Sequence, residues 1–207
     1  MSANLLGTVN DYYRRLRKKV PIRTMLGLRS KDNYWNRRAE LHYYQVVKRL
    51  IEEFSPGKLL VDVGAWNTPV VTWGTFQRRV SIDLHSRPRN DPRVEEVVAD
   101  WLTYESEDIA DLIVCLQVLE HIGDDQVKPF AEKIARSGRW AIISVPYMWE
   151  AGKCIYHRQD PVDLKKLEGW VGYPASRHII EDRDPDKRLI AVFKGAKNLG
   201  AETARNE

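Results

Sequence analysis

The chain has 207 residues, a length that fits one domain with additional segments and can bury a sizeable core. Its composition, 43% hydrophobic and 30% charged residues with a mean hydropathy of −0.49, is ordinary for a soluble protein. No run approaches the roughly 20 apolar residues of a transmembrane helix, and early charges interrupt any secretory signal. Two cysteines cannot form a disulfide framework, so we expect a cytoplasmic protein.

The net charge of +4 is unevenly distributed along the chain. Residues 1–38 contain ten Lys and Arg against two Asp, which gives this segment a charge of +8. Such a cluster attracts RNA phosphates, an anionic membrane surface or an acidic glycan, or it forms the solvated face of a helix. Aromatic residues of the segment either stack on a ligand or anchor it to the core: Tyr12, Tyr13, Tyr34 and Trp35.

Helical patterns precede Pro56-Gly57. The pattern predicts a basic helix over residues 9–19 and a second helix over residues 35–54, where apolar residues recur every three or four positions. Pro56-Gly57 interrupts the helical pattern, and beyond it the spacing of apolar residues changes. These features predict a basic helical N-terminal arm (1–56), an α/β domain (57–195) and a polar tail (196–207).

Beyond Gly57, short apolar runs rich in β-branched residues alternate with helical segments. This alternation predicts an α/β fold with a doubly wound, mostly parallel sheet. The expected strands are residues 58–63, 80–84, 94–99, 111–116 and 140–145, and the expected helices are residues 68–76, 103–109, 118–135 and 161–170. Two further strands, 177–181 and 188–194, are joined by a short polar link and must pair antiparallel.

Polar residues stand at the ends of successive predicted strands, where open α/β sheets bind their ligands. Gly64, after the first strand, allows a tight turn or a close approach to a ligand. Asp83, 21 positions beyond Asp62, suits two vicinal ribose hydroxyls. Asp100 and Trp101, after the third strand, are candidates to pair with the amine of an adenine and to flank its ring, and Gln117 follows the fourth strand.

This ordered set resembles class I S-adenosylmethionine (SAM)-dependent methyltransferases over residues 58–194. Residues 60–64 (LVDVG) are similar to the first motif of that family, residues 99–101 (ADW) to its adenine-contacting motif, and residues 116–122 (LQVLEHI) to the segment after its fourth strand. The resemblance implies a Rossmann-like seven-stranded sheet with an antiparallel last strand, and SAM as cofactor. The cofactor-binding residues that it implies are Asp62, Gly64, Ala65, Asp83, Asp100, Trp101 and Gln117.

The loop after Gly64 departs from the family pattern. The first motif usually continues with further glycines, and here Trp66 and Thr68 take their places. The departure argues against a nicotinamide dehydrogenase, which needs G-x-G-x-x-G to hold its pyrophosphate. It leaves a second hypothesis open: a methyltransferase-like binding or scaffold protein that has lost catalysis.

Methylation of an alcohol or phenol benefits from a general base, most often histidine. His157, in a polar loop after the fifth predicted strand, is the first candidate, with Asp160 to orient its imidazole; His121 is the second. The sequence predicts no metal site. Residues 157–174 also resemble uncharacterised bacterial relatives associated with glycan genes, which favours O-methylation of a small-molecule or saccharide acceptor.

Methylation of nucleic-acid bases is disfavoured. The base amino-methylases carry an Asx-Pro-Pro-aromatic motif after the fourth strand, where this chain reads LQVL, and neither cysteine follows a proline as in the C5-cytosine enzymes. An enzyme directed to RNA or to a membrane surface by the basic arm remains an alternative.

Overall fold

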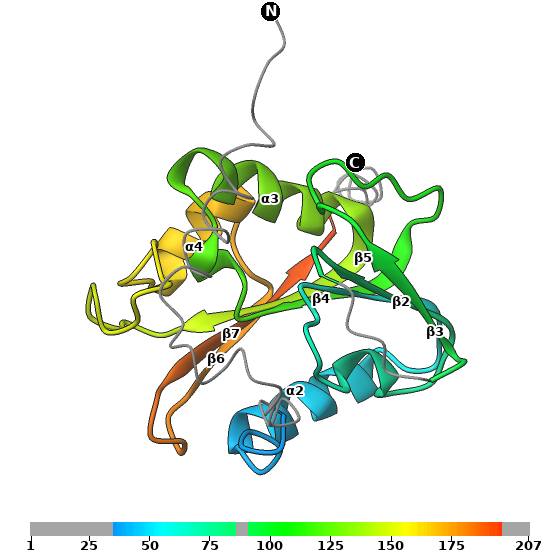
Figure 1. The fold of residues 1–207 in the computed structure, drawn as a ribbon, viewed down its shortest axis with the longest axis horizontal. Helices are drawn as coiled ribbons and strands as arrows, with labels where there is room; N and C mark the ends of the chain where they lie inside the picture. Colours follow the sequence, from blue (N-terminus) through cyan, green and yellow to red (C-terminus); the bar gives the residue numbers. More distant parts are fainter. Residues whose placement is uncertain (1–34, 86–90, 196–207) are drawn as a thin grey trace, which may run out of the picture. The chain divides into compact units, whose positions relative to one another are not determined.

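The computed structural model describes residues 35–85 and 91–195, and its larger compact unit begins at Arg38. These residues form a seven-stranded sheet of order β3-β2-β1-β4-β5-β7-β6 (Figure 1). Its strands are β1 (Gly57–Val63), β2 (Phe76–Asp83), β3 (Val94–Val98), β4 (Ala110–Leu116), β5 (Gly138–Pro146), β6 (Arg177–Glu181) and β7 (Arg188–Lys194). The predicted helix over residues 9–19 and the polar tail lie outside the described residues, as does almost all of the basic segment.

The sheet has a parallel part and an antiparallel part, as the sequence predicts. The strands from β3 to β5 pair parallel, whereas β7 runs antiparallel to both β5 and β6. The central strands are buried on both faces, which is why they read as continuous apolar runs rather than as alternating ones. The predicted doubly wound α/β fold with an antiparallel last strand is confirmed.

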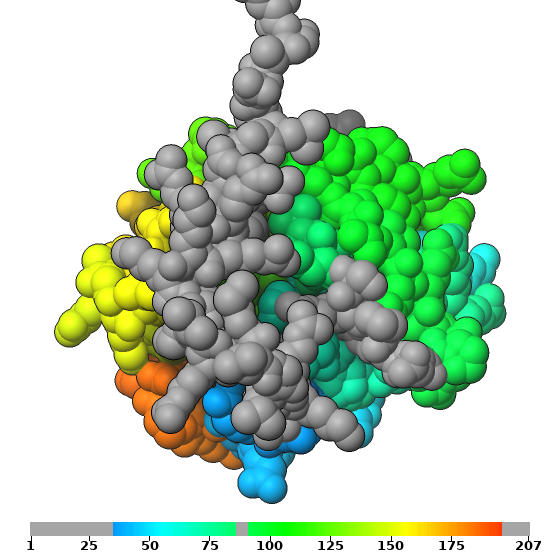
Figure 2. Space-filling view, viewed as in Figure 1, coloured from blue at the N-terminus to red at the C-terminus, as the bar shows by residue number. Residues whose placement is uncertain are grey.

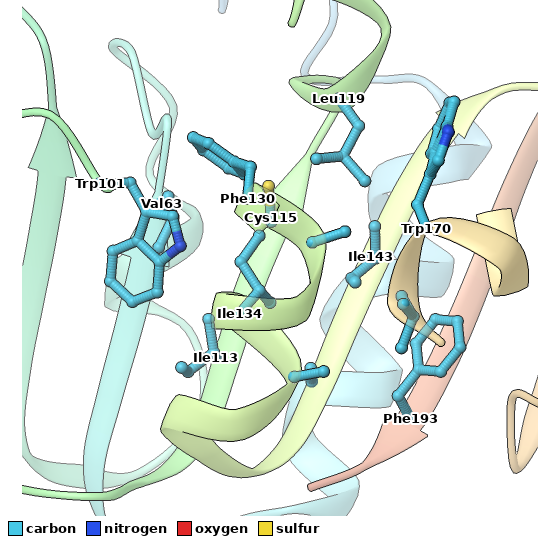
Figure 3. Close-up of a cluster of buried hydrophobic side chains, with 14 of the residues drawn as sticks. Val63, Trp101, Ile113, Cys115, Leu119, Phe130, Ile134, Ile143, Trp170 and Phe193 are labelled. Atoms are coloured by element: carbon cyan, nitrogen blue, oxygen red, sulfur yellow. The ribbon is translucent and has the colours of Figure 1, made fainter. Parts of the chain in front are cut away.

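Helices cover both faces of the sheet (Figure 1). One face carries α3 (Asp124–Ser137) and α4 (Leu164–Val171), and the other carries α2 (His42–Glu53). Under α3, the strand residues Ile113 and Ile143 face the helix residues Phe130 and Ile134 in one buried apolar cluster (Figure 3). No helix in the described ranges is long and apolar enough to cross a membrane.

The N-terminus of α2 is capped by a residue distant in the sequence. Leu41, which precedes the helix, has no side chain that can cap it. The carboxylate of Asp184, in the β6–β7 turn, instead accepts the backbone N–H groups of His42 at 2.9 Å and Tyr43 at 2.8 Å. A carboxylate there satisfies free N–H groups and interacts favourably with the helix dipole. The α2 residues (blue) accordingly lie beside the β6–β7 hairpin (orange) in Figure 2.

The unit that contains α2 differs from the one that the sequence predicts. Helix α2 falls within the predicted arm, 1–56, yet its residues Tyr43, Val47 and Ile51 are fully buried against the sheet. The compact unit therefore includes α2, and the change of period at Pro56-Gly57 marks a helix-to-strand turn inside it.

The helix predicted over residues 68–76 is wrong. A single 3₁₀ turn, η2 (Val70–Thr72), occupies this segment, and β2 begins at Phe76, four positions before the predicted strand. Valine and threonine are weak helix formers. Gly74 then adopts φ +65°, a left-handed conformation that ends the turn.

The segment 103–109 is a turn end followed by irregular chain instead of the predicted helix. Asp100 accepts the N–H of Leu102 at 2.9 Å, and the Lys133 ammonium binds the carbonyl oxygens of Leu102 and Tyr104. These side chains take the backbone groups that a helix would use. The prediction over 118–135 is divided, because Gly123 separates the 3₁₀ turn η3 (Leu119–His121) from α3.

Replacing Ile143 by alanine should lower the free energy of unfolding by about 2–5 kcal/mol, because the side chain is fully buried in β5 and its loss leaves a cavity. The matched control is Ile155→Ala, since Ile155 is 80% exposed. Urea denaturation of the two variants measures both changes; equal losses would contradict the described core.

Candidate functional site

The carboxyl ends of β1 and β4 meet where the strand order reverses. The chain passes from β1 outward to β2 and β3, and then returns to the other side of β1 as β4. Such a switch point is where open α/β sheets bind ligands. The loops there are in direct contact, because a Cβ atom on Gly64 would lie 2.4 Å from a methyl group of Val118. The predicted glycine is thus required by the close approach of the second loop, and also by its own φ of +73°.

Backbone strain is concentrated at this edge of the sheet. Among the described residues, three non-glycine residues have a clearly positive φ: Trp66 at 46°, Gln117 at 57° and Met148 at 53°. They follow β1, β4 and β5, which are neighbours in the sheet. This conformation is unfavourable for residues with a Cβ, and such strain often marks a functional site. The observation supports a ligand site here independently of any motif.

Asp83 connects the ends of β1 and β2. Its Oδ2 accepts the N–H of Trp66 at 3.0 Å, and its Oδ1 accepts the N–H of His85 at 2.9 Å. The carboxylate is partly exposed, and each oxygen keeps lone pairs for further hydrogen bonds. Asp83 is therefore held in one orientation and can still accept hydroxyl groups.

Other predicted cofactor residues lie at the same edge but differ in burial. Asp62 and Ala65 are buried, and Asp100 is half-buried where its carboxylate caps the following turn. Trp101 is 4% exposed and packs in the core, with its ring stacked at 6.2 Å from that of Tyr104. Contact of Trp101 with an adenine ring therefore stays a prediction, as do the roles of its neighbours.

Gln117 starts a polar chain that the sequence does not predict. Its amide donates to the Ser144 hydroxyl at 3.2 Å, and that hydroxyl lies 2.5 Å from the Tyr43 hydroxyl. The Tyr43 ring also lies under the Arg188 guanidinium, 5.3 Å from its centroid. Burial raises the pKa of Tyr43, so its hydroxyl keeps its proton. In the sequence, Tyr43 occupies one of the apolar positions of a predicted helix. It reaches the Ser144 hydroxyl only because α2 packs against the sheet.

The two predicted catalytic histidines come together. His157 Nδ1 lies 2.6 Å from Asp160 Oδ2, as the sequence predicts for an oriented imidazole, and both side chains are buried. The His121 ring is 4.8 Å from that of His157 at a steep angle. The Trp149 ring also stacks on that of His157, with a centroid distance of 5.4 Å. Trp149 has no signal in the sequence, because it stands in an irregular loop.

Glu120 is a buried acidic residue of the site. Its side chain is 1% exposed, and burial raises the pKa of its carboxyl to about 8. Its Oε2 has no hydrogen-bond partner among the described residues. His121 beside it is 39% exposed on its side chain, and partial burial lowers the pKa of its imidazole. Ligand atoms from Glu120, His121 and His157 lie within 4.8 Å of one another, although the sequence predicts no metal site.

The sheet order and the ligand edge define the class I SAM-dependent methyltransferase fold, and comparison with solved structures agrees. No family model and no curated protein matches the chain. It is similar to the 1,6-didemethyltoxoflavin-N1-methyltransferase of Burkholderia thailandensis, with a TM-score of 0.64 and 15% identity over 94% of this chain and 93% of that one.

Two further structures show the same likeness. The N-methyltransferase NodS of Bradyrhizobium japonicum gives a TM-score of 0.61 and 14% identity, covering 90% of this chain and 97% of that one. The magnesium protoporphyrin IX methyltransferase of Synechocystis gives 0.58 and 16%, covering 92% and 95%. All three were crystallised with S-adenosylhomocysteine (SAH). At these identities, the likeness establishes the fold.

Replacing Gly64 by alanine should destabilise the protein by more than the same change at Gly152. Both glycines have a positive φ, so each variant incurs about 1–2 kcal/mol of backbone strain. Only the new methyl group at residue 64 collides with Val118, since residue 152 has nothing within 4 Å. Urea denaturation measures the difference. Adding Val118→Ala should recover part of it, whereas equal losses at both glycines would argue against contact of the two loops.

Proposed function

We propose that the chain is a SAM-dependent methyltransferase acting on a small molecule, and that a hydroxyl oxygen of a small molecule or saccharide is the favoured acceptor. The observation that carries the proposal is the placement of Asp83. Its carboxylate stands at the end of β2, fixed against the β1 loop by the N–H of Trp66, beside the switch point of the sheet. A carboxylate so placed suits the two hydroxyls of a ribose.

The remaining strand ends would hold the other parts of SAM. Gly64 and Ala65 would line the cofactor on the β1 side, Asp100 and Trp101 on the β3 side, and Gln117 across the switch point. Asp62 is buried near the end of β1, just before the loop that begins at Gly64. The loop after Gly64 lacks the further glycines whose backbone would bind a phosphate. SAM has no phosphate, so its binding does not need them.

The Trp66 ring lies near the end of β2, on the cofactor side of the proposed site. Its indole centroid lies 6.3 Å from the ring of His85, which follows β2. The ring therefore packs toward β2, whereas the acceptor side of the proposed site lies across the switch point at β4 and β5. This arrangement is compatible with a methyl donor bound between the β1 and β4 loops.

Methyl transfer needs the acceptor oxygen in line with the donor sulfur and methyl group. The sulfonium of SAM supplies an activated methyl group. Held at the ends of β1, β2 and β4, SAM would supply this methyl group to the acceptor oxygen and would leave as SAH, so the product would be a methyl ether. His157, oriented by Asp160, takes the hydroxyl proton, with His121 as the second candidate base.

The cellular compartment and the partners that we expect for this reaction follow from the sequence. Cys115 is buried and Cys154 is half-buried, both as free thiols, which is consistent with the cytoplasmic setting that we expect. The alternative of RNA or membrane-surface recruitment depends on residues 1–38, nearly all of which lie outside the described residues.

The cofactor site is tested by calorimetric titration with SAH. Asp83→Ala should weaken binding at least about 100-fold, because two hydrogen bonds to a charged acceptor contribute about 1.5–3 kcal/mol each. Asp108→Ala is the matched control, since Asp108 is an exposed partner of Arg78 at the opposite end of the sheet. Melting temperatures of both variants verify that they are folded. Unchanged affinity in folded Asp83→Ala protein would exclude the assigned ribose site.

Catalysis is tested by SAH formation from SAM across a panel of saccharides, phenols and amines. With an accepted substrate, His157→Gln should lower kcat by about 10²–10⁴-fold, the usual contribution of a general base. His178→Gln, on the exposed part of β6, should leave kcat unchanged. Full activity of His157→Gln would exclude the assigned base. SAH binding without turnover of any compound would instead favour the scaffold hypothesis.

A further inference from the structure

Three potential metal ligands converge at the acceptor side of the site. Glu120 and His121 belong to η3, just after β4, and His157 lies in the loop between β5 and α4. One ligand atom of each lies within 4.8 Å of the other two. In a tetrahedral site with bonds of about 2.1 Å, ligand atoms lie about 3.4 Å apart. Small side-chain rotations therefore suffice to close the cluster around one ion.

Both imidazoles are oriented as metal-binding histidines usually are. A ligating histidine generally donates its other ring N–H to a carboxylate or a backbone carbonyl, which fixes its tautomer. His157 Nδ1 lies 2.6 Å from the Asp160 carboxylate, and His121 Nδ1 lies 3.1 Å from the carbonyl oxygen of Tyr156. With Nδ1 as the donor in each ring, the lone pair is on Nε2. His121 Nε2 is also the atom nearest Glu120, 4.0 Å from its Oε1.

Glu120 supplies an independent indication that a cation belongs here. Its Oε2 is buried without a hydrogen-bond partner among the described residues, and its side chain is 1% exposed. Burying a carboxylate is costly unless it is paired or bound to a metal.

The two segments that carry the ligands are held together by their backbones. The carbonyl oxygen of Glu120 accepts the N–H groups of Arg158 at 2.7 Å and Gln159 at 3.3 Å. The Gln159 amide in turn donates to the carbonyl of Ile122 at 2.9 Å and to Asp124 at 2.8 Å. The cluster is thus preorganised by contacts that do not depend on the ligand side chains.

We propose that Glu120, His121 and His157 bind a divalent transition-metal ion. Two imidazole nitrogens and one carboxylate oxygen suit Zn²⁺, Fe²⁺, Co²⁺ or Mn²⁺, whereas Mg²⁺ and Ca²⁺ prefer sites made of oxygen. Three protein ligands leave at least one coordination position open, as in catalytic rather than structural sites. The sequence conceals this site because Glu120 and His121 lie 36 or more positions before His157.

The role of the ion rests on the proposed function. A divalent cation lowers the pKa of a hydroxyl bound at its open position. The acceptor oxygen would then be activated by the metal, and His157 would be a ligand rather than the base. Metal binding is measurable without any acceptor, so it can be tested separately from methyl transfer.

The experiment is a titration of tag-free, chelator-treated protein with Co²⁺, followed by visible absorption and calorimetry. We expect one tightly bound Co²⁺ per chain, with d–d absorption bands, displaced by Zn²⁺. Glu120→Gln, His121→Gln and His157→Gln should each abolish the bands, and Asp160→Asn should weaken binding about 10–100-fold through its contact with His157. His178→Gln, which changes a histidine outside the cluster, should bind Co²⁺ like the original protein.

Titration of the same samples with SAH separates the two proposals. His121→Gln that binds SAH but no Co²⁺ supports the metal site and verifies that the variant is folded. No Co²⁺ binding by the original protein, or binding that survives in both His121→Gln and His157→Gln, would overturn the metal site. If the original protein binds Co²⁺ but does not bind SAH, only the proposed function is overturned.

Discussion

Hydrogen bonding places β1 between β2 and β4, and the rest of the site depends on that pairing. The chain leaves β1 toward one edge of the sheet and resumes at β4 on the other side, so the two following loops lead to opposite halves of the molecule. They nevertheless touch, because Gly64 has no side chain to keep Val118 away. Asp83 and Asp100 therefore fall on one side of this contact, and the histidine cluster on the other.

The part of this edge that carries the histidine cluster is built at a cost in stability. It contains two strained residues, Gln117 and Met148, and two buried carboxylate atoms, on Glu120 and Asp160, without a hydrogen-bond partner among the described residues. Each feature is unfavourable for folding and is offset by the apolar packing beneath it. In the same chain, the strands and the α3 face follow ordinary packing rules closely. Departures that gather at one edge of an otherwise regular sheet are expected of a functional site.

The strands could be predicted from the sequence because burial on both faces leaves a long apolar run in each. The ordered strand-end residues could be predicted for a related reason, since parallel strands bring their carboxyl ends to one edge. The absence of the helices predicted over 68–76 and 103–109 could not be predicted in full, because some of the contacts that replace them are not local. Gly74 turns under the helix-to-strand corner at Ser55, and Lys133 of α3 takes the carbonyl groups of Leu102 and Tyr104. Tyr43 and Ser144 were hidden for the same reason, since their pairing spans 101 positions.

The Asp184 cap makes one of the first helices of the described chain dependent on one of its last turns. The two partners are 142 positions apart, so the first turn of α2 has to await the β6–β7 hairpin before its N–H groups are satisfied. During synthesis, almost the whole sheet leaves the ribosome before this helix can complete its N-terminus. Contacts of such long range close late in folding because chain entropy must be overcome first. Tyr43 reaches Ser144 only from a docked α2, so we expect this hydrogen bond to form late in folding, after the strands that support it have paired.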